Sequence, residues 1–343
     1  MRIATYNVEW FNNLFDDAGH LLEDGGWSGR HDVTRAEQIA GLGIVFTALD
    51  ADAVMVIEAP DENGRRSTVT ALENFARQFD LRASRAVVGF GNHTQQEIAL
   101  LYDPDVLEAR HDPLGEGTGK KGSPDAPRFD GVFRIDLDID ASEDLVSFSK
   151  PPLELALRHL ATGFRFRMIG AHLKSKAPHG AHGRDAVMRL AIANRRKQLA
   201  QAIWLRQRIE HHLAAEEPLM VMGDLNDGPG LDEYEHLFGR SSVEIVMGGV
   251  PRLFDPHAAQ ALTLRPGAAL PSTARFYIAP QKRFLQALLD YIMLSPELAA
   301  TAPAWRIWHP MDDPRCWAVP ELRDALISAS DHYPVTLDIE LPT

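Results

Sequence analysis

The sequence predicts an α/β fold, and two observations support this prediction. Short apolar runs of strand length alternate along the chain with longer segments whose apolar residues recur at helical spacing. No linker rich in Pro, Gly or Ser divides the 343 residues, and no segment repeats at a fixed period. A chain of this length can bury a large core. We therefore expect residues 1–343 to form one domain, with loop insertions near 111–128 and 296–329.

The first part of the chain contains predicted strands that carry polar residues. A β-prone run near the N-terminus is interrupted by Asn7, and strands disfavour this residue type. Thr34 and Glu37 form a capping-box pattern, which predicts a helix that ends at about Leu49. The apolar run that follows predicts a buried strand ending in Glu58. The other elements expected here are a helix over 67–79 and strands over 83–88 and 95–102.

The rest of the chain is predicted to contain a hairpin, a long helix and several single strands. Strands over 153–160 and 164–173 flank a short turn with Gly163, which is the pattern of a β-hairpin. Apolar residues recur near one face between Asp185 and His211 and predict a long helix. Further strands are expected over 132–139, 218–223, 287–294 (where Asp290 interrupts the apolar run) and 335–341, with a short helix over 231–238.

The segment 299–329 combines three tryptophans with prolines and acidic residues. We expect an ordered insertion there. Its large side chains would either line a cleft or simply pack against the rest of the protein, and the sequence does not distinguish these alternatives.

Composition and charge limit the possible functions. The net charge of −13 argues against a protein that holds nucleic acid with a broad basic surface. A nuclease stays possible, because bound cations supply positive charge where a phosphate sits. Cys316 is the single cysteine, so the chain cannot form an internal disulfide. No apolar run approaches the length of a membrane span and no signal-peptide pattern is visible, so we expect a cytoplasmic protein. For the oligomeric state, we favour a monomer.

The most informative stretch runs from Pro218 to Asp227. A short apolar run ends at Gly223, and the polar side chains of Asp224 and Asn226 follow with one residue between them. Residues i and i+2 of an extended chain lie on the same side, so a carboxylate and an amide oxygen point at one spot. This pair suits a hard cation and the phosphate that the cation binds. An Asx-type turn explains the same two residues if they are considered alone.

Polar groups at or beside the ends of apolar strands recur along the chain. Several such strand ends can converge on one edge of a sheet sandwich and form an oxygen-rich metal site between two histidines. Phosphoester cleavage needs these parts, namely a divalent cation, a base for the attacking water and a donor for the developing negative charge. Glu97 and Asp290 are suited to fixing the tautomers of the histidines. The residues concerned are Asn7, Glu58, Glu97, His172, Asp224, Asn226, Asp290, Asp331 and His332.

Short motifs around these residues occur in the order typical of one known family. They are residues 4–8, 56–58, 96–99, 170–175, 223–226, 289–292 and 330–334. Each motif is weak alone, but together they span almost the whole chain, which resembles the endonuclease/exonuclease/phosphatase superfamily and its deoxyribonuclease I-like members. The resemblance implies a four-layer α/β/β/α sandwich of two packed sheets flanked by helices, with the site at one edge.

The resemblance also implies which residues bind the metal and the phosphate. Glu58 would be the principal ligand of a divalent cation, with Asp331 beside the metal and Asn7 close to both metal and phosphate. The cation would be Mg²⁺, with Mn²⁺ or Ca²⁺ as alternatives. Asp224 and Asn226 would orient the nucleophile and contact phosphate oxygens.

Two histidines complete the implied site. His332 would be the general base or a phosphate-contacting imidazole, oriented by Asp290. His172 would pair with Glu97 and approach the scissile phosphate from the other side. This pair is more similar to the deoxyribonuclease I and sphingomyelinase branches than to the abasic-site endonucleases. Lys174 would contact a phosphate, although ordinary solvation explains a lysine at that position equally well.

Three functions are compatible with these residues. We prefer a metal-dependent nuclease or phosphodiesterase whose partner is a nucleic acid. The alternatives are a phosphatase or phosphodiesterase for a small or lipid phosphate, and an inactive binding module. The complete set of polar residues argues against the inactive module. The acidic balance weakens the case for a nuclease, although Arg65, Arg66 and the basic residues of the long helix would make a local positive strip.

Overall fold

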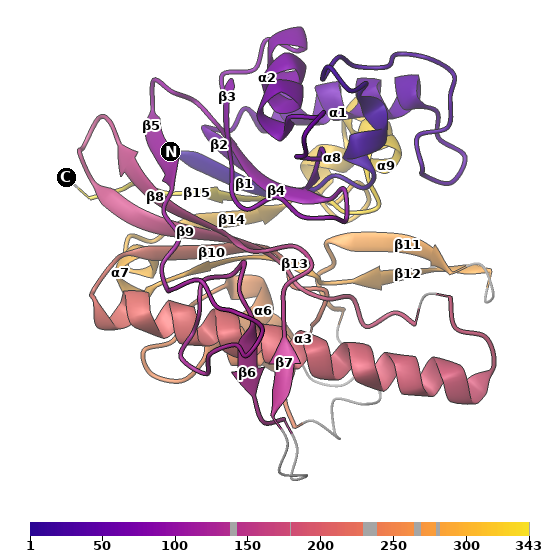
Figure 1. Cartoon of the computed structure of the whole chain (residues 1–343). Helices are drawn as coiled ribbons and strands as arrows, with labels where there is room; N and C mark the ends of the chain where they lie inside the picture. The colour runs from indigo at the N-terminus through magenta and orange to yellow at the C-terminus, as the bar shows by residue number, and fades with distance from the viewer. Residues whose placement is uncertain (138–142, 179, 229–238, 264–268, 279–281, 343) are drawn as a thin grey trace.

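Two β-sheets lie face to face in the computed structural model, which describes residues 1–137, 143–178, 180–228, 239–263, 269–278 and 282–342 (Figure 1). The first sheet contains β1 (Arg2–Asn7), β2 (Ala53–Ala59), β3 (Arg85–Val88), β4 (Glu97–Tyr102), β14 (Ala304–Ile307) and β15 (Val335–Asp338). Its strand order is β14-β15-β1-β2-β4-β3. β1 and β2 are parallel, and the other neighbours are antiparallel.

The second sheet contains β5 (Leu107–His111), β8 (Leu153–His159), β9 (Arg165–His172), β10 (Leu219–Asp224) and β13 (Asp290–Leu294). Its strand order is β13-β10-β9-β8-β5, in which only β9 and β10 are parallel neighbours. Two hairpins lie outside both sheets, one of β6 (Phe133–Ile135) with β7 (Asp144–Val146), the other of β11 (Ala274–Ile278) with β12 (Arg283–Ala287).

Helices cover the outer faces of both sheets (Figure 1). α1 (Arg35–Leu49), α2 (Thr68–Gln78) and α9 (Pro320–Ala329) share an apolar cluster with the outward side chains of the first sheet. α3 (Arg184–Ala214) shares another cluster with the outward side chains of the second sheet. A third cluster, which includes Met55 of β2 and Met168 of β9, fills the space between the sheets. The predicted four-layer α/β/β/α sandwich is therefore confirmed.

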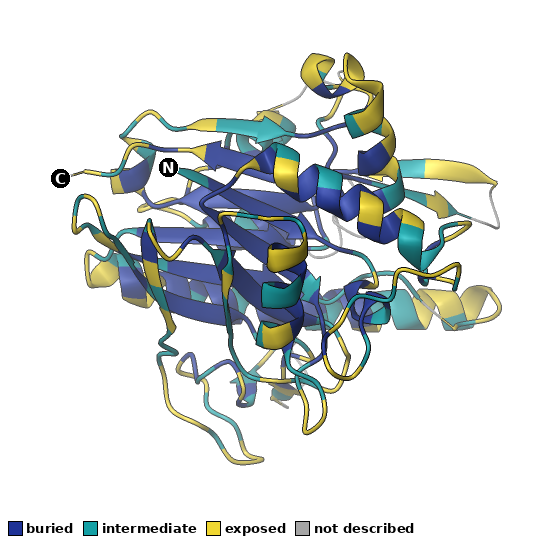
Figure 2. Cartoon of the chain, turned by 90° about the horizontal axis from the view of Figure 1, so that it is seen from above, coloured by how far each residue is buried: buried dark blue, intermediate teal, exposed yellow. Residues whose placement is uncertain are grey.

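Burial follows these layers. The strands are mostly buried, whereas the covering helices keep an exposed outer side (Figure 2). No helix in the described part of the chain is both long and apolar enough to cross a membrane. The short helices are η1 (Phe11–Leu14), α5 (Ser242–Met247), α6 (Pro256–Thr263), α7 (Pro296–Ala299) and α8 (Pro314–Trp317).

Local signals placed most of the main helices and strands correctly. The capping box of Thr34 and Glu37 forms at the start of α1, and the Ser67 side chain caps α2. The turn with Gly163 joins β8 to β9, so the predicted hairpin is confirmed. After His111, the predicted insertion over 111–128 contains no helix or strand. The predicted helix over 231–238 lies outside the described residues, and of the predicted strand over 132–139 only β6 is observed.

The predicted single strand over 287–294 is wrong. The run is divided between two elements, because β12 ends at Ala287 and β13 begins at Asp290 in the second sheet. Where β13 begins, the backbone N–H groups of Leu289 and Asp290 both donate to the Thr273 hydroxyl at 3.0 Å. Asp290 therefore starts a strand instead of interrupting one.

The prediction of a loop insertion over 296–329 is also wrong. β14 forms an edge strand of the first sheet, and α9 packs against α1. Three of the five prolines of this segment occupy the first turns of α7, α8 and α9. Proline suits this position because the first N–H groups of a helix have no partner within the helix. The tryptophans of this segment were expected either to line a cleft or to pack against the rest of the protein. Trp308 packs, because it is buried in the apolar cluster that also contains residues of α1.

Gly223 allows β9 and β10 to approach each other at the functional edge. Its φ is +126°, and a Cβ atom built on it would lie 2.1 Å from the carbonyl oxygen of Ala171. Side-chain-bearing residues rarely adopt this backbone conformation. The glycine is thus required both for its φ and for the space it leaves.

We expect Gly223→Ala to lower the free energy of unfolding by about 3 kcal/mol or more, because backbone strain and overpacking act together. Gly163→Ala is the matched control, since Gly163 also has a positive φ (+71°) but has nothing within 4 Å of its Cβ position. The control should cost only about 1–2 kcal/mol. Urea denaturation of both variants measures the difference, and equal losses would show that the contact with Ala171 is unimportant.

Candidate active site

The predicted site residues lie together at one edge of the sandwich. β1, β2, β9 and β10 approach this edge with their carboxyl ends, whereas the antiparallel strands β4, β13 and β15 start there. β10 and its parallel neighbour β9 both end at this edge, whereas β13, which is antiparallel to β10, begins there. The register therefore places Asp224 of β10 opposite both His172 of β9 and Asp290 of β13. The polar strand ends noted in the sequence thus converge.

The carboxylate of Asp224 is the centre of the site. Its Oδ2 accepts hydrogen bonds from Asn7 Nδ2 at 3.0 Å and from Asn226 Nδ2 at 3.2 Å, and its Oδ1 accepts one from the Asn226 backbone at 2.7 Å. The same Oδ2 lies 3.6 Å from His172 Nε2 and 3.9 Å from His332 Nε2. Burial raises the pKa of this carboxyl above its ordinary value, although the charge of His332 opposes the shift.

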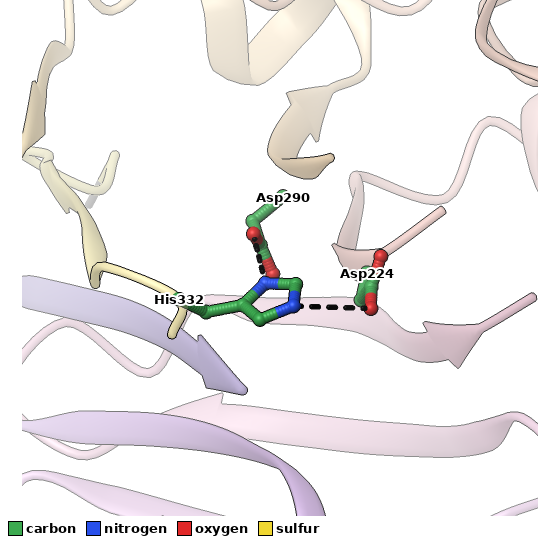
Figure 3. A group of neighbouring side chains, drawn as sticks. All are labelled: Asp224, Asp290 and His332. Atoms are coloured by element: carbon green, nitrogen blue, oxygen red, sulfur yellow. Dashed lines mark hydrogen bonds and ion pairs between the residues drawn. The ribbon is translucent and has the colours of Figure 1, made fainter. Parts of the chain in front are cut away.

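His332 and Asp290 form a buried pair (Figure 3). Nδ1 of the imidazole lies 2.7 Å from Oδ2 of Asp290, which leaves Nε2 facing Asp224. Burial alone would lower the pKa of His332, but the charge of Asp290 and its hydrogen bond raise it well above the ordinary value. The predicted orientation of His332 by Asp290 therefore agrees with the observed geometry.

Glu58 lies at a strained position where β2 bulges. Its φ is +62°, and the pairing of β2 with β4 shifts register at this residue. Gln96 donates to Oε2 at 2.7 Å, and Oε1 lies 4.0 Å from His172 Nε2. Burial raises the pKa of Glu58, and the charge of Lys150 lowers it in part. A left-handed residue in a strand is costly and is often kept where function needs its side chain in one direction.

The oxygen atoms around Glu58 fit a hard divalent cation. Asn7 Oδ1 is buried and has no hydrogen-bond partner among the described residues. Asp331 Oδ1 lies 4.0 Å from His332 Nε2, and its charge raises the pKa of Glu58. An amide carbonyl oxygen and two carboxylates are donor types that Mg²⁺, Mn²⁺ and Ca²⁺ prefer, so the chemistry of these three residues fits such a cation.

Asp224, Asp290 and His332 form a second group of potential ligands, whose donor atoms lie within 4.8 Å of one another. In this group the His332 Nδ1 is already engaged by Asp290 at 2.7 Å. We therefore interpret this group as a hydrogen-bonded relay, and a metal held by Glu58 stays a prediction.

Lys150 is a site residue that the sequence analysis missed. It precedes β8, and its Nζ lies 3.2 Å from both ring nitrogens of His172. Burial lowers the pKa of Lys150, against the opposing charges of Glu58 and Asp224. Burial, followed by the charge of Lys150, lowers the pKa of His172 well below its ordinary value. His172 is therefore neutral and can accept a hydrogen bond from the ammonium group.

The predicted pairing of His172 with Glu97 is wrong. The Glu97 carboxylate accepts hydrogen bonds from the Asn92 backbone at 3.2 Å and from Asn92 Nδ2 at 2.7 Å, and no described interaction joins it to His172. The turn before β4 folds back over this acid and supplies its donors, so Glu97 stabilises the turn. Burial raises its pKa to about 7.

Lys174 lies near the site without a described side-chain contact to the other site residues. Its backbone N–H donates to Gln201 at 2.8 Å, and its charge lowers the pKa values of Lys150 and His172. A direct contact of Lys174 with a phosphate stays a prediction.

Two further residues position the site and were not singled out from the sequence. Ser330 donates to the Asn7 carbonyl at 2.7 Å and accepts from the His332 backbone at 3.1 Å, so it ties β1 to the segment that carries His332. Gln96 holds Glu58, as described above. Both lie inside the motifs used for the resemblance, which was the available signal. Lys150 lies outside them.

Solved structures with the same fold include two that cover nearly the whole chain. Truncated TDP2 from Caenorhabditis elegans is 13% identical with a TM-score of 0.51, over 99% of this chain and 97% of that one. A mannosyl-6-phosphatase from Bacteroides thetaiotaomicron is 16% identical with a TM-score of 0.50, over 99% and 100%. At such identities the likeness concerns the fold alone. No curated protein sequence matches the chain.

The family pattern itself extends over most of the sequence. The sequence model of the Endonuclease/Exonuclease/phosphatase family matches residues 4–332. This range begins in β1 and ends at His332, so it contains all of the site residues described above. The chain therefore belongs to the Endonuclease/Exonuclease/phosphatase family and, with it, to the hydrolases of phosphoester bonds.

Proposed function

We propose that the chain is a divalent-metal-dependent phosphodiester hydrolase and that its substrates come from nucleic acid. One observation carries the proposal. Asn7, His172 and His332 come from distant parts of the chain, yet each has a side-chain nitrogen within 3.9 Å of the buried Asp224 carboxylate. A phosphate and an attacking water need such a combination of donors, a base and an acceptor in one place.

His332 is proposed as the general base. Asp290 holds Nδ1, so Nε2 is the ring nitrogen that can take a proton from a water beside Asp224. The charge of Asp290 then stabilises the imidazolium that forms. Asp224 orients the water by accepting a hydrogen bond from it, and the Asn226 backbone holds one carboxylate oxygen of Asp224 in place.

His172 and Lys150 are proposed to bind the phosphate from the opposite side. Neutral His172 and the ammonium of Lys150 lie 3.2 Å apart and both can donate to a phosphate oxygen. Lys150 would add positive charge as negative charge develops there. A cation held by Glu58, Asn7 and Asp331 would supply further neutralisation of the phosphate.

A phosphodiesterase or phosphatase for small molecules or lipid phosphates is the second candidate function. The net charge of −13 favours it, because a protein that tracks along a polymer of phosphates normally carries excess Lys and Arg. The same side chains would perform the chemistry in both cases.

We expect the protein to hydrolyse bis-p-nitrophenyl phosphate with Mg²⁺ or Mn²⁺ and Glu58→Gln to abolish this activity, because a neutral amide holds a divalent cation more weakly. Parallel assays on single- and double-stranded DNA, RNA and phosphate monoesters identify the substrate class. Glu108→Gln on β5, with 63% of its side chain exposed, is the matched control. Circular dichroism verifies that both variants fold, and unchanged activity of Glu58→Gln would refute the assignment.

His332→Ala should lower kcat by on the order of a hundredfold or more. Asp290→Asn should also lower kcat, and the double variant should be no slower than His332→Ala, because the two residues act as a unit. Steady-state kinetics of the three variants test this. A loss confined to KM would move the base elsewhere.

The pH dependence of kcat/KM separates the two roles of His332. A base must be neutral, and Asp290 raises the pKa of His332, so activity should rise with pH through an apparent pKa above the ordinary histidine value. Asp290→Asn removes this cause and should move the rise to lower pH. A profile that falls with pH over the same range would make the imidazolium the active form.

Lys150→Met should lower kcat/KM by about tenfold to a hundredfold, since a charge-assisted hydrogen bond is worth about 1.5–3 kcal/mol. Lys150→Arg should retain part of the activity, because the positive charge stays. Lys121→Met, at an exposed lysine, is the control. If Lys150→Met matches the control, Lys150 only neighbours His172 and does not bind phosphate.

A further inference from the structure

A large pocket opens directly beside the proposed catalytic site. Its volume is about 1100 Å³, and it shares Ser330 and Asp331 with the site. The walls come from α1, α9 and the β11–β12 hairpin, which projects from the edge of the sandwich (Figure 1). The proposed mechanism uses none of these walls, so the pocket is available for a part of the substrate other than its phosphate.

The hairpin wall is hydrogen bonded to the segment that carries His332. Ala274 forms a β-bridge with His332, Arg275 N–H donates to the Asp331 carbonyl at 2.7 Å, and Tyr333 N–H donates to the Thr273 carbonyl at 2.6 Å. The pocket wall and the proposed base are therefore held together, and a group bound in the pocket lies next to the reacting phosphate.

Flat side chains form a continuous row on this wall. The guanidinium of Arg275 lies 3.9 Å from the ring centroid of Phe284, whose ring centroid lies 5.3 Å from that of Tyr277. Tyr277 in turn lies 5.9 Å from the ring of His31. Tyr277 and Phe284 are 43% and 52% exposed, so part of each ring is accessible to another flat group. Such a row suits stacking with an aromatic ring.

The charges of the pocket differ between its buried and exposed parts. Next to the site, Arg30 pairs with Glu9 at 2.9 Å and has only 10% of its side chain exposed. The exposed part carries four carboxylates, of which one precedes α1, one lies in the first turn of α1 and two lie in α9. They are Asp32, Glu37, Glu321 and Asp324. A second phosphate that followed the bound ring would meet these carboxylates and be repelled.

We propose that this pocket binds one nucleoside-sized aromatic group attached to the scissile phosphate, and that no further phosphate follows that group within the pocket. The inference rests on the proposed phosphodiester hydrolysis and defines its substrate class. The enzyme then acts on small nucleotide diesters or on the terminal nucleotide of a strand. A polymer that continues in both directions from the scissile bond does not fit.

Binding measurements test the aromatic part of the proposal without relying on catalysis. By isothermal titration calorimetry in Mg²⁺ buffer, thymidine 5′-monophosphate should bind at least tenfold more tightly than methyl phosphate. Phe284→Ala should remove this preference and leave methyl phosphate binding unchanged. Trp317→Ala is the matched control, because Trp317 is 56% exposed with Arg323 5.1 Å from its ring centroid, and it does not line the pocket. Equal affinities in the wild type, or no effect of Phe284→Ala, would overturn the proposal.

Thymidine 3′,5′-bisphosphate tests the exclusion of a second phosphate. It should bind no more tightly than the monophosphate, and Glu321→Gln with Asp324→Asn should strengthen bisphosphate binding alone. Tenfold tighter binding of the bisphosphate to the wild type would refute the exclusion. These results are independent of the Glu58→Gln assay. Loss of the aromatic preference with intact hydrolysis refutes the pocket assignment only, whereas absence of diester hydrolysis with intact preference refutes the proposed function only.

Discussion

The hydrogen bond between Asn7 and Asp224 is the interaction on which the rest of the site depends. Asn7 ends β1 in the first sheet and Asp224 ends β10 in the second, so their bond of 3.0 Å joins the two sheets at the functional edge. A carboxylate as buried as Asp224 is costly without donors. Asn7 and Asn226 provide them, and His172 and His332 lie against the same oxygen. Because the donors come from both sheets, the site forms only when the sheets pack in their observed alignment.

Backbone strain is concentrated at the same edge. Glu58, Gly223 and Asn226 have φ values of +62°, +126° and +50° at or just after the ends of their strands. Two of the three carry side chains and occupy a region that L-residues disfavour. The rigid strands on either side supply the stability that keeps these conformations. The strain directs Glu58 toward His172 and lets the Asn226 backbone hold Asp224, which accounts for its persistence.

The acidic composition and the proposed handling of phosphate are compatible because the charges are separated in space. Lys150 lies inside the site beside His172, and Arg30 lines the neighbouring pocket, where it pairs with Glu9. Four exposed carboxylates also line that pocket. A compact phosphoester would thus meet positive charge at its phosphate, whereas a long polyanion would meet acids beyond it. Under the proposed function, this arrangement would make a net negative protein selective without preventing phosphate binding.

The sequence by itself determined the α/β class and most of the polar strand ends, because an apolar run that stops at Asp224 or a motif around His332 is a local pattern. The four layers were implied by the resemblance of these motifs to a known family. Only the tertiary structure decided which polar groups meet. Glu97 was expected beside His172, yet the turn before β4 supplies its partner, and Lys150 takes the place beside His172. A lysine in a loop has no local signature of function, since most lysines are solvated. Contacts of this kind depend on distances between segments far apart in the chain, which exist only after the two sheets have packed.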